Sequence, residues 1–223
     1  MKPLEELERE LGEALAEIRP ADQGRVEAAL RHWDAVAHPL HSLGLLEEAV
    51  ARLAGAAPLR RDYKKCVAAF CADNGVVAQG VTQTDSSITA KVAKSMLEGT
   101  SSVCCMARVT GADVFPVDAG MAVDVEGLPS VKVACGTRDL AVEPAMTRRQ
   151  ALHVLLAGMD MARDLKERGY TLLSAGEMGI GNTTTSAAVL AALTGSSVEA
   201  VSGRGGGLTD AGFARKKAVL RQA

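Results

Sequence analysis

Residues 174–185 combine the residue types that bind an anion with one acid that does not fit. The stretch holds three glycines, an asparagine and three threonines. It follows an apolar run at 170–173 that predicts a strand, and it precedes an Ala- and Leu-rich run at 186–193 that predicts a helix. Such a turn directs backbone N–H groups and the positive end of a helix dipole at one point, which suits a phosphate. Glu177 would be repelled there, so we expect a sugar or a cationic reacting centre beside it.

The same stretch nearly matches a P-loop, because four residues separate Gly176 from Gly181 and Asn182–Thr183 follow. A P-loop has lysine where Asn182 stands, and that ammonium group bridges the terminal phosphates of a nucleoside triphosphate. Asparagine brings no charge, so the sequence disfavours a nucleotide hydrolase and favours a cradle for a single phosphate. A turn that only packs the helix against the strand is the alternative.

A second glycine-rich segment, Gly203–Gly207, contains Arg204 and precedes Lys216. Its four glycines allow close approach of the backbone to a ligand, and the two cations could neutralise a phosphate dianion. A flexible tether would have the same composition. Because two glycine-rich turns fall at one expected sheet edge, the phosphate cradle is favoured over the tether.

Strands that alternate with helices from residue 65 onward predict an α/β fold, a doubly wound parallel sheet of the Rossmann-like kind. We expect strands at 66–72, 113–117, 131–134 and 170–173, and a short one at 198–201. Pro116 weakens the second strand or moves it to an edge. Ligands of such sheets bind beyond the carboxyl ends of the strands, where four charged candidates fall: Asp73, Asp118, Arg138 and Glu177. The two aspartates could instead only cap helices.

We expect two parts, a helical N-terminal segment over residues 1–60 and an α/β domain over residues 61–223. Apolar residues recur at helical spacing between Leu4 and Ile18. They predict an amphipathic helix that packs on its own domain or forms a dimer seam. Two further helices are expected at 22–36 and 42–53, the last with Ser42 as its candidate N-cap.

Composition argues against several classes of partner. The net charge of −2, the pI of about 6.1 and an aromatic content of 3% disfavour nucleic acid and membrane surfaces. Five cysteines form no CxxC pair and lie in apolar surroundings, which predicts reduced core thiols. Four histidines lack ligand spacing, so we expect no metal and no cofactor. An acidic N-terminus without a signal-peptide pattern, and no apolar run near the roughly 20 residues of a membrane span, predict a cytoplasmic protein.

Linked motifs give the sequence a recognisable pattern. Gly176–Thr184 resembles the signature of nicotinate-nucleotide–dimethylbenzimidazole phosphoribosyltransferases, and so does Gly203–Gly205 followed by Ala214–Lys216. Upstream, shorter motifs resemble the family in the same order: Ser42–Glu47, Asp73–Thr82, Val117–Gly120, Gly136–Arg138 and Ala145–Thr147. The resemblance extends from Trp33 to the end of the chain, and several motifs in order make it specific.

The resemblance implies an activity and its substrates. Enzymes of this family transfer phosphoribose from nicotinate mononucleotide to a benzimidazole-type base. The products are nicotinate and an α-riboside 5′-phosphate, which becomes the lower ligand of cobalamin. The resemblance also implies a homodimer. This activity agrees with turns that cradle one phosphate and with an acid beside an oxocarbenium-like centre.

The resemblance also assigns residues to the site. It implies that phosphate and ribose are held by Gly179, Gly181, Asn182, Thr183, Gly203, Arg204, Gly205 and Lys216. It implies that the base pocket is formed by Thr82, Gln83, Thr84, Ser86 and Met178. Glu177 would be the catalytic carboxylate that assists beside the ribose and the attacking nitrogen of the base.

Three features depart from the family pattern. Asn74 stands where the family usually has histidine, and Gln83–Ser86 replaces aromatic and proline residues, which implies a more polar base pocket. Family members continue beyond the position of Ala223, and their principal general base lies in that part. We therefore expect a piece of a longer enzyme or one chain of a split enzyme. The alternative is a non-catalytic module that binds a phosphorylated ligand or a partner chain.

Overall fold

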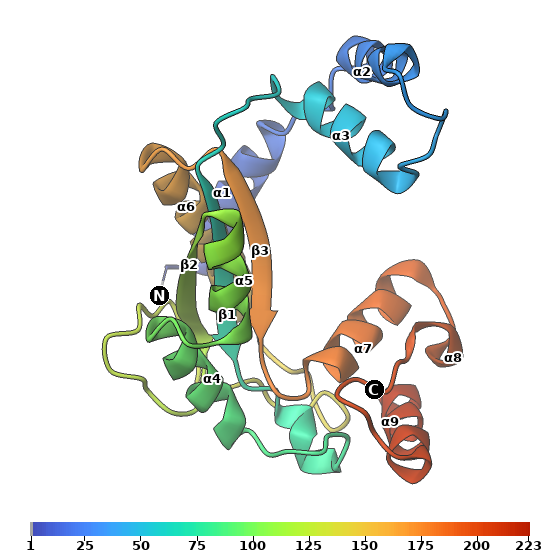
Figure 1. Ribbon diagram of the computed structural model, residues 1–223. Helices are drawn as coiled ribbons and strands as arrows, with labels where there is room; N and C mark the ends of the chain where they lie inside the picture. Colours follow the sequence, from blue (N-terminus) through green and yellow to red (C-terminus); the bar gives the residue numbers. More distant parts are fainter. Residues whose placement is uncertain (1) are drawn as a thin grey trace. The chain divides into compact units, whose positions relative to one another are not determined.

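The computed structural model describes residues 2–223, which form two units (Figure 1). Residues 10–63 make up one unit, and residues 2–9 with 64–223 make up the other. Helix α1 (Leu4–Ala16) begins in the larger unit, and its Leu7 is buried there. No helix within the described residues is long and apolar enough to cross a membrane.

The smaller unit contains two helices packed against each other, α2 (Gln23–Ala35) and α3 (Leu45–Ala56). Asp22 caps α2, because its side chain accepts a hydrogen bond from the Arg25 N–H at 3.1 Å. The expected start of the next helix at Ser42 is wrong. Its N-cap is Gly44, whose φ of 54° lies in the left-handed region that favours glycine.

Three parallel strands form the sheet of the larger unit in the order β2-β1-β3. They are β1 (Lys65–Ala72), β2 (Ala112–Gly120) and β3 (Leu172–Met178). The apolar β1 takes the central place, and Pro116 lies in an edge strand, where a missing N–H is tolerated. The predicted α/β fold with a parallel sheet is confirmed.

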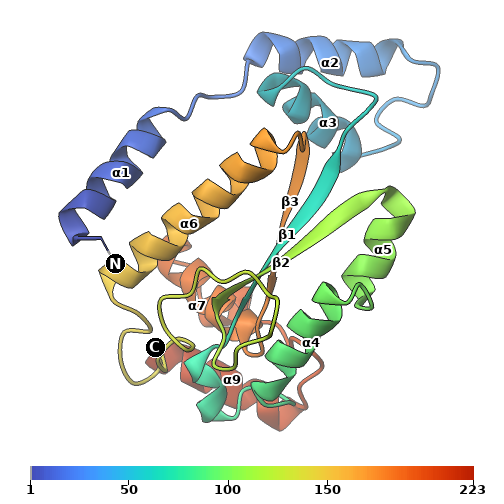
Figure 2. The same ribbon diagram turned by 90° about the vertical axis from the view of Figure 1, so that its left-hand side faces the viewer.

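Helices cover both faces of this sheet (Figure 2). On one face lies α6 (Arg148–Glu167), whose Leu165 packs with Cys66 and Ala68 of β1 in a buried cluster. On the other lie α4 (Ser87–Leu97) and α5 (Ser102–Thr110). This two-sided cover is the doubly wound arrangement that the sequence predicts.

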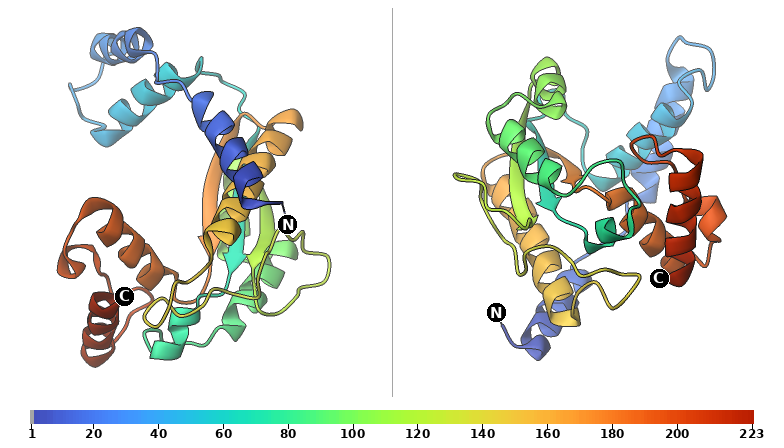
Figure 3. Two further views of the ribbon diagram at one scale, coloured as in Figure 1. Left: turned by 180° about the vertical axis from the view of Figure 1, so that it is seen from behind. Right: turned by 90° about the horizontal axis from the view of Figure 1, so that it is seen from below.

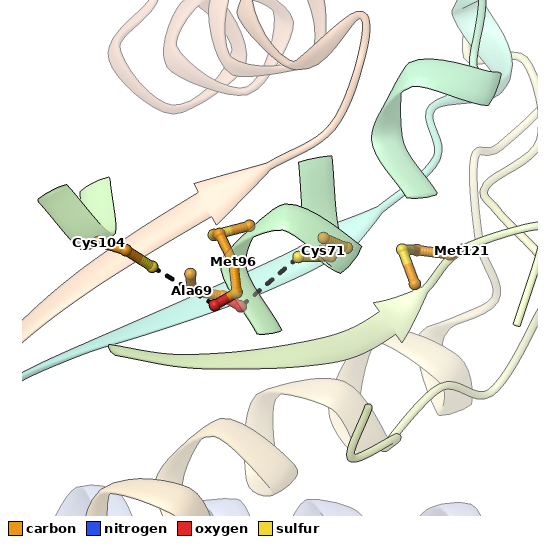
Figure 4. Close-up of a cluster of buried hydrophobic side chains, with 6 residues drawn as sticks. Ala69, Cys71, Met96, Cys104 and Met121 are labelled. Atoms are coloured by element: carbon orange, nitrogen blue, oxygen red, sulfur yellow. Dashed lines mark hydrogen bonds between the residues drawn. The ribbon is translucent and has the colours of Figure 1, made fainter. Parts of the chain in front are cut away.

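The core under α4 and α5 consists of small and sulfur-containing side chains (Figure 4). Its buried members are Ala69, Cys71, Ala93, Met96, Cys104 and Met121. Residues 69 and 71 of β1 face this cluster, whereas residues 66 and 68 face α6, which is the two-residue period of a strand. The low aromatic content of the sequence therefore matches a core of closely packed small residues.

The five free cysteines divide into two groups. Cys66, Cys71 and Cys104 are buried, whereas Cys105 and Cys135 are exposed, which corrects the expectation that all lie in the core. Cys105 follows Cys104 on α5 and is turned about 100° around the helix, so it faces solvent. Burial raises the pKa of Cys71 to about 11, so little reactive thiolate forms at neutral pH.

Iodoacetamide at pH 7.5 should therefore alkylate Cys105 and Cys135 in the native protein and leave the three buried thiols unmodified, because alkylation requires an accessible thiolate. Tandem mass spectrometry of tryptic peptides identifies each modified site, because fragmentation distinguishes Cys66 from Cys71 and Cys104 from Cys105 within shared peptides. The same reaction in urea, where all five should react, is the control. Modification of Cys71 at equal rates in both conditions would contradict the buried core.

Two predicted strands take other forms in the structure. Segment 131–134 makes no ladder, and only Ser130 bridges to Asp118 of β2. The Val131 N–H donates to the Asp118 carbonyl at 2.8 Å as part of this single parallel bridge, and the Thr137 N–H donates to the Asp73 carbonyl at 3.0 Å. The chain thus crosses from the end of β2 to the end of β1 instead of continuing beside β2.

Residues 198–201 form a short helix, α8 (Val198–Val201), in place of the expected strand. Ser197 caps it by accepting a hydrogen bond from the Ala200 N–H at 3.3 Å. It packs with α7 (Asn182–Thr194) and α9 (Asp210–Gln222) beyond the end of β3 (Figure 3). These three helices and the loops between them hold most of the residues that the resemblance assigns to phosphate and ribose, namely Asn182, Thr183, Gly203, Arg204, Gly205 and Lys216.

Candidate functional site

A cleft of about 280 Å³ lies beyond the carboxyl end of β3. Three segments line it: Val81–Thr84, Met178–Thr183 and the loop with Arg204, Gly205, Gly206 and Leu208. The structure therefore brings together the β3–α7 turn, the second glycine-rich loop and the expected base-pocket loop. Among the predicted site residues, those that line the cleft are Thr82, Gln83, Thr84, Met178, Gly179, Gly181, Asn182, Thr183, Arg204 and Gly205.

The β3–α7 turn fits against the end of β1 because it contains glycine. A Cβ atom on Gly179 would lie 2.3 Å from the Ala72 carbonyl oxygen, which no side chain tolerates. Gly181 is the N-cap of α7 and has a φ of 90°, and a Cβ there would lie 2.9 Å from Val77. The two glycines thus start α7 four residues earlier than its apolar run predicts.

Replacing Gly179 with alanine should lower the free energy of unfolding by about 2 kcal/mol or more, since the clash is with backbone and cannot relax by a rotamer change. Urea denaturation measures the loss. Gly206→Ala is a matched control, because a Cβ on Gly206 meets no atom within 4 Å. Equal stability of the two variants would contradict the close contact of the turn with β1.

Glu177 does not line the cleft, but it contacts Asn182, which does. The Asn182 amide donates a hydrogen bond to the Glu177 carboxylate, and this bond holds the carboxylate beside the turn. Partial desolvation raises the pKa of Glu177 above its ordinary value, and the bond from Asn182 acts in the opposite direction. The acid whose charge does not suit an anion site therefore has a fixed orientation next to the anion turn.

Lys216 is a cation completely enclosed by protein. Its side chain is 0% exposed, and its ammonium group donates to the Thr183 hydroxyl at 2.8 Å and to the Gly203 carbonyl at 2.9 Å. Both partners are neutral, and no carboxylate among residues 2–223 forms an ion pair with it. Burial lowers the pKa of Lys216. A buried ammonium group whose hydrogen-bond partners are neutral is stabilised when an anion binds beside it.

The second glycine-rich loop joins this cation to the start of α7. Gly205 has a φ of 56°, and a Cβ there would lie 2.7 Å from the Thr183 hydroxyl oxygen. Arg204 is held by the Leu208 carbonyl and the Asp210 carboxylate, and it stacks 5.1 Å from the Phe213 ring. The Arg204 guanidinium thus already forms an ion pair with a carboxylate, whereas the Lys216 ammonium forms none with the described carboxylates.

The expected base-pocket loop is fastened to the other side of the cleft. The Gln83 amide donates to the Gly207 carbonyl, and the Thr82 hydroxyl donates to the Thr84 carbonyl at 2.8 Å. Ser86 does not line the cleft and is the N-cap residue of α4. Hydroxyl and amide groups therefore face the cleft where the sequence replaces aromatic and proline residues.

The other strand-end candidates do not line this cleft. The buried Asp118 carboxylate accepts the Gly120 and Met121 N–H groups at 2.9 and 2.7 Å and pairs with Lys132 at 3.1 Å. Asp73 is also buried, and it accepts the Ala122 N–H at 2.8 Å. Both acids fix the backbone where strands end.

Arg138 lies at a different hollow, of about 160 Å³, lined chiefly by small apolar residues. Its guanidinium binds the Pro144 carbonyl at 2.8 Å and the Glu143 carboxylate at 3.2 Å. Within residues 2–223, no three His, Cys, Asp or Glu side chains group as metal ligands would.

Two further side chains contact the β3–α7 turn, although sequence patterns do not place them there. Asn74 donates to the Ile180 carbonyl at 3.0 Å, and Thr89 accepts the Ile180 N–H at 3.2 Å. In the sequence Asn74 stands out only as a departure from a family pattern, and Thr89 is one polar residue in an amphipathic helix. No local signal could have found them, because both contacts join residues about 100 positions apart in the sequence.

The chain is similar to known proteins in both sequence and structure. A family model described as "Phosphoribosyltransferase" matches residues 18–223. Two similar curated proteins, from Clostridium perfringens (39% identical over 216 residues) and Roseiflexus sp. (40% over 218 residues), are each named nicotinate-nucleotide–dimethylbenzimidazole phosphoribosyltransferase. The crystal structure of CobT from Thermus thermophilus is similar with a TM-score of 0.80 and 38% sequence identity.

These matches cover nearly all of this chain but only part of the relatives. The two curated matches span 95% and 96% of the chain but 60% and 62% of the relatives. The CobT match spans 89% of the chain and 61% of that protein. The chain therefore spans about 60% of the length of the curated relatives it matches.

Proposed function

The chain belongs to the family of nicotinate-nucleotide–dimethylbenzimidazole phosphoribosyltransferases, and we propose that its cleft binds nicotinate mononucleotide for transfer of the phosphoribose to a benzimidazole-type base. Nicotinate and an α-riboside 5′-phosphate for the lower ligand of cobalamin are the products. The observation that carries the proposal is the buried Lys216 ammonium, which has neutral partners and lies beside the start of α7. One enclosed positive charge suits one phosphate.

The phosphate would bind in the cleft against Thr183 and Gly205, with the Lys216 ammonium behind them in contact with the Thr183 hydroxyl. An anion there offsets the cost of the buried ammonium and also meets the positive end of the α7 dipole. Close contact of Gly205 with Thr183 keeps the loop near the helix without a side chain in between. The site is therefore complementary to a single 5′-phosphate rather than to a triphosphate.

Glu177 would act on the ribose. In the reaction the bond from C1′ to the nicotinate nitrogen breaks, and its electron pair returns to the cationic ring. The unprotonated ring nitrogen of the incoming base forms the new bond to C1′, and the proton on the other ring nitrogen of the base is then released to water. The Glu177 carboxylate, held by Asn182, would stabilise positive charge that develops at C1′.

The base would lie against Thr82, Gln83, Thr84 and Met178, which line the cleft, and Ser86 follows along the chain as the N-cap residue of α4.

We also propose a homodimer, which the exposed apolar side chains Leu4 and Leu15 of α1 support; light scattering tests it. A cytoplasmic location stays a prediction.

Incubation of the chain with nicotinate mononucleotide and dimethylbenzimidazole tests the proposed activity. We expect nicotinate release, followed by liquid chromatography, that depends on both substrates and exceeds the rate without protein. Binding of the mononucleotide without release would favour the alternative, a module that binds a phosphorylated ligand. Absence of both binding and release would contradict the proposal.

A further inference from the structure

The peptide group of Ile180, in the centre of the β3–α7 turn, is held from two sides. Its N–H donates to the Thr89 hydroxyl of α4 at 3.2 Å, and its carbonyl accepts from the Asn74 amide at 3.0 Å. Thr89 is 0% exposed and Asn74 is half-buried, and neither lines the cleft. We propose that Asn74 and Thr89 are positioning residues that hold this turn in its ligand-binding form.

Asn74 connects the turn to the helix that follows it. Its amide oxygen accepts a hydrogen bond from the Thr185 hydroxyl at 2.9 Å, while its amide nitrogen serves the Ile180 carbonyl. Thr185 belongs to the first turn of α7. One side chain at the end of β1 therefore fixes both the turn and the start of α7, and it needs a donor and an acceptor to do so.

The backbone of the turn packs tightly against the Asn74 side chain. A Cβ on Gly179 would lie 2.8 Å from the Asn74 amide nitrogen, and one on Gly181 would lie 3.3 Å from the Asn74 Cβ. Asn74 thus lies directly beneath the glycine backbone. The turn cannot shift without breaking bonds to Asn74 or Thr89, and a buried group that loses its partner is costly.

This clamp, meaning Asn74 with Thr89, acts on the groups that face the cleft. Asn182 and Thr183 follow the turn directly, and they contact Glu177 and Lys216 respectively. A displaced turn would move Asn182 and Thr183 and so break their contacts with Glu177 of β3 and Lys216 of α9. Loss of the clamp should therefore weaken ligand binding while the sheet and core stay intact.

Thr89→Val tests the clamp, because valine keeps the shape of threonine and removes only the hydroxyl. We expect the amide of Ile180 to lose about tenfold of its hydrogen-exchange protection in the ligand-free protein, and Kd for nicotinate mononucleotide to rise about tenfold, as one lost buried hydrogen bond implies. Thr89→Ser, which restores the hydroxyl, should return both values to within about threefold of wild type. The melting temperature is followed for all variants.

Asn74→Asp is the second variant. It keeps the acceptor for Thr185 but replaces the donor with an oxygen that repels the Ile180 carbonyl, so it should also weaken protection and binding about tenfold. Unchanged Ile180 protection in Thr89→Val, or lost protection with an unchanged Kd, would overturn the positioning role. So would equal loss in Thr89→Val and Thr89→Ser.

The use of nicotinate mononucleotide as the test ligand rests on the proposed function. The clamp and the proposed function can fail separately. If wild type does not bind nicotinate mononucleotide, the proposed function is contradicted. Hydrogen exchange without ligand then judges the clamp alone. Protection that is lost in the valine variant and recovered in the serine variant supports it, and unchanged protection overturns it.

Discussion

Lys216→Met should weaken binding of nicotinate mononucleotide by about 100-fold, since loss of a buried charge-assisted contact costs about 3 kcal/mol. In wild type the enclosed ammonium has only the Thr183 hydroxyl and the Gly203 carbonyl as partners, so the phosphate supplies its missing negative charge. Methionine fills a similar volume without charge. Because a buried unpaired cation is itself costly, the variant should fold with equal or higher stability. Calorimetric titration and thermal unfolding measure the two effects.

The neighbouring Lys217 provides a matched control. Its ammonium group lies 4.6 Å from the Phe213 ring and does not contact Thr183. Lys217→Met removes the same charge from the same helix, so a general electrostatic effect would weaken binding equally in both variants. Weakening confined to Lys216→Met identifies the buried ammonium as the anion partner. A Kd within about threefold of wild type for Lys216→Met would contradict that role.

The lowered pKa of Lys216 also predicts a pH dependence with a definite sign. The unfolded chain keeps this proton up to its ordinary value of 10.5, whereas the native protein loses it at lower pH. The unfolded state therefore binds more protons in that window, and the contribution of Lys216 to the free energy of unfolding rises with pH there. Affinity for the phosphate should fall over the same window. Lys216→Met should abolish both trends.

Glu177→Gln should lower kcat for nicotinate release by about 100-fold, while Kd for nicotinate mononucleotide changes by less than about threefold. The amide keeps the size of the side chain but cannot stabilise the positive charge that develops at C1′ in the transition state. An interaction made chiefly in the transition state affects kcat more than ground-state binding. Single-turnover measurements of nicotinate release, with binding measured separately, give the two values.

Glu126→Gln is the control for this prediction, because it removes an equal charge from an exposed loop outside the cleft.

The stability of Glu177→Gln gives an independent test. The pKa of Glu177 is raised, so its ionised form disfavours folding as pH rises through the native pKa. Glu177→Gln should thus be at least as stable as wild type at pH 7, and any difference should vanish in acid. Loss of affinity equal to the loss of kcat would make Glu177 a binding residue instead.

Those parts of the fold that local patterns determine could be predicted from the sequence. The continuous apolar run at 66–72 predicts the central strand, and Gly195 ends α7 in the left-handed conformation. Segment 131–134 has the same apolar character but crosses the strand ends, because its backbone bonds to Asp118 and Asp73. Periodicity records only which residues are apolar, so it cannot distinguish a strand from a crossing segment.

The site residues also divide into those that local patterns indicate and those that depend on tertiary contacts. Glycine spacing and a family resemblance select the residues of the cleft, and the structure brings most of them together. The enclosure of Lys216 could not be predicted, since its place in α9 resembles that of the more exposed Lys217. Nor could Asn74 and Thr89, whose partners lie about 100 residues away. Burial and pairing depend on tertiary contacts that no local pattern records.

Calorimetric titration of the wild-type chain and of Lys216→Met with nicotinate mononucleotide is the decisive experiment for the phosphoribose site. We expect one site per chain with a Kd below about 1 mM in wild type, in the range of ordinary metabolite affinities, and a Kd about 100-fold higher in the variant. Absence of binding to wild type at millimolar mononucleotide, or equal binding by the two proteins, would contradict a phosphoribose site built around Lys216.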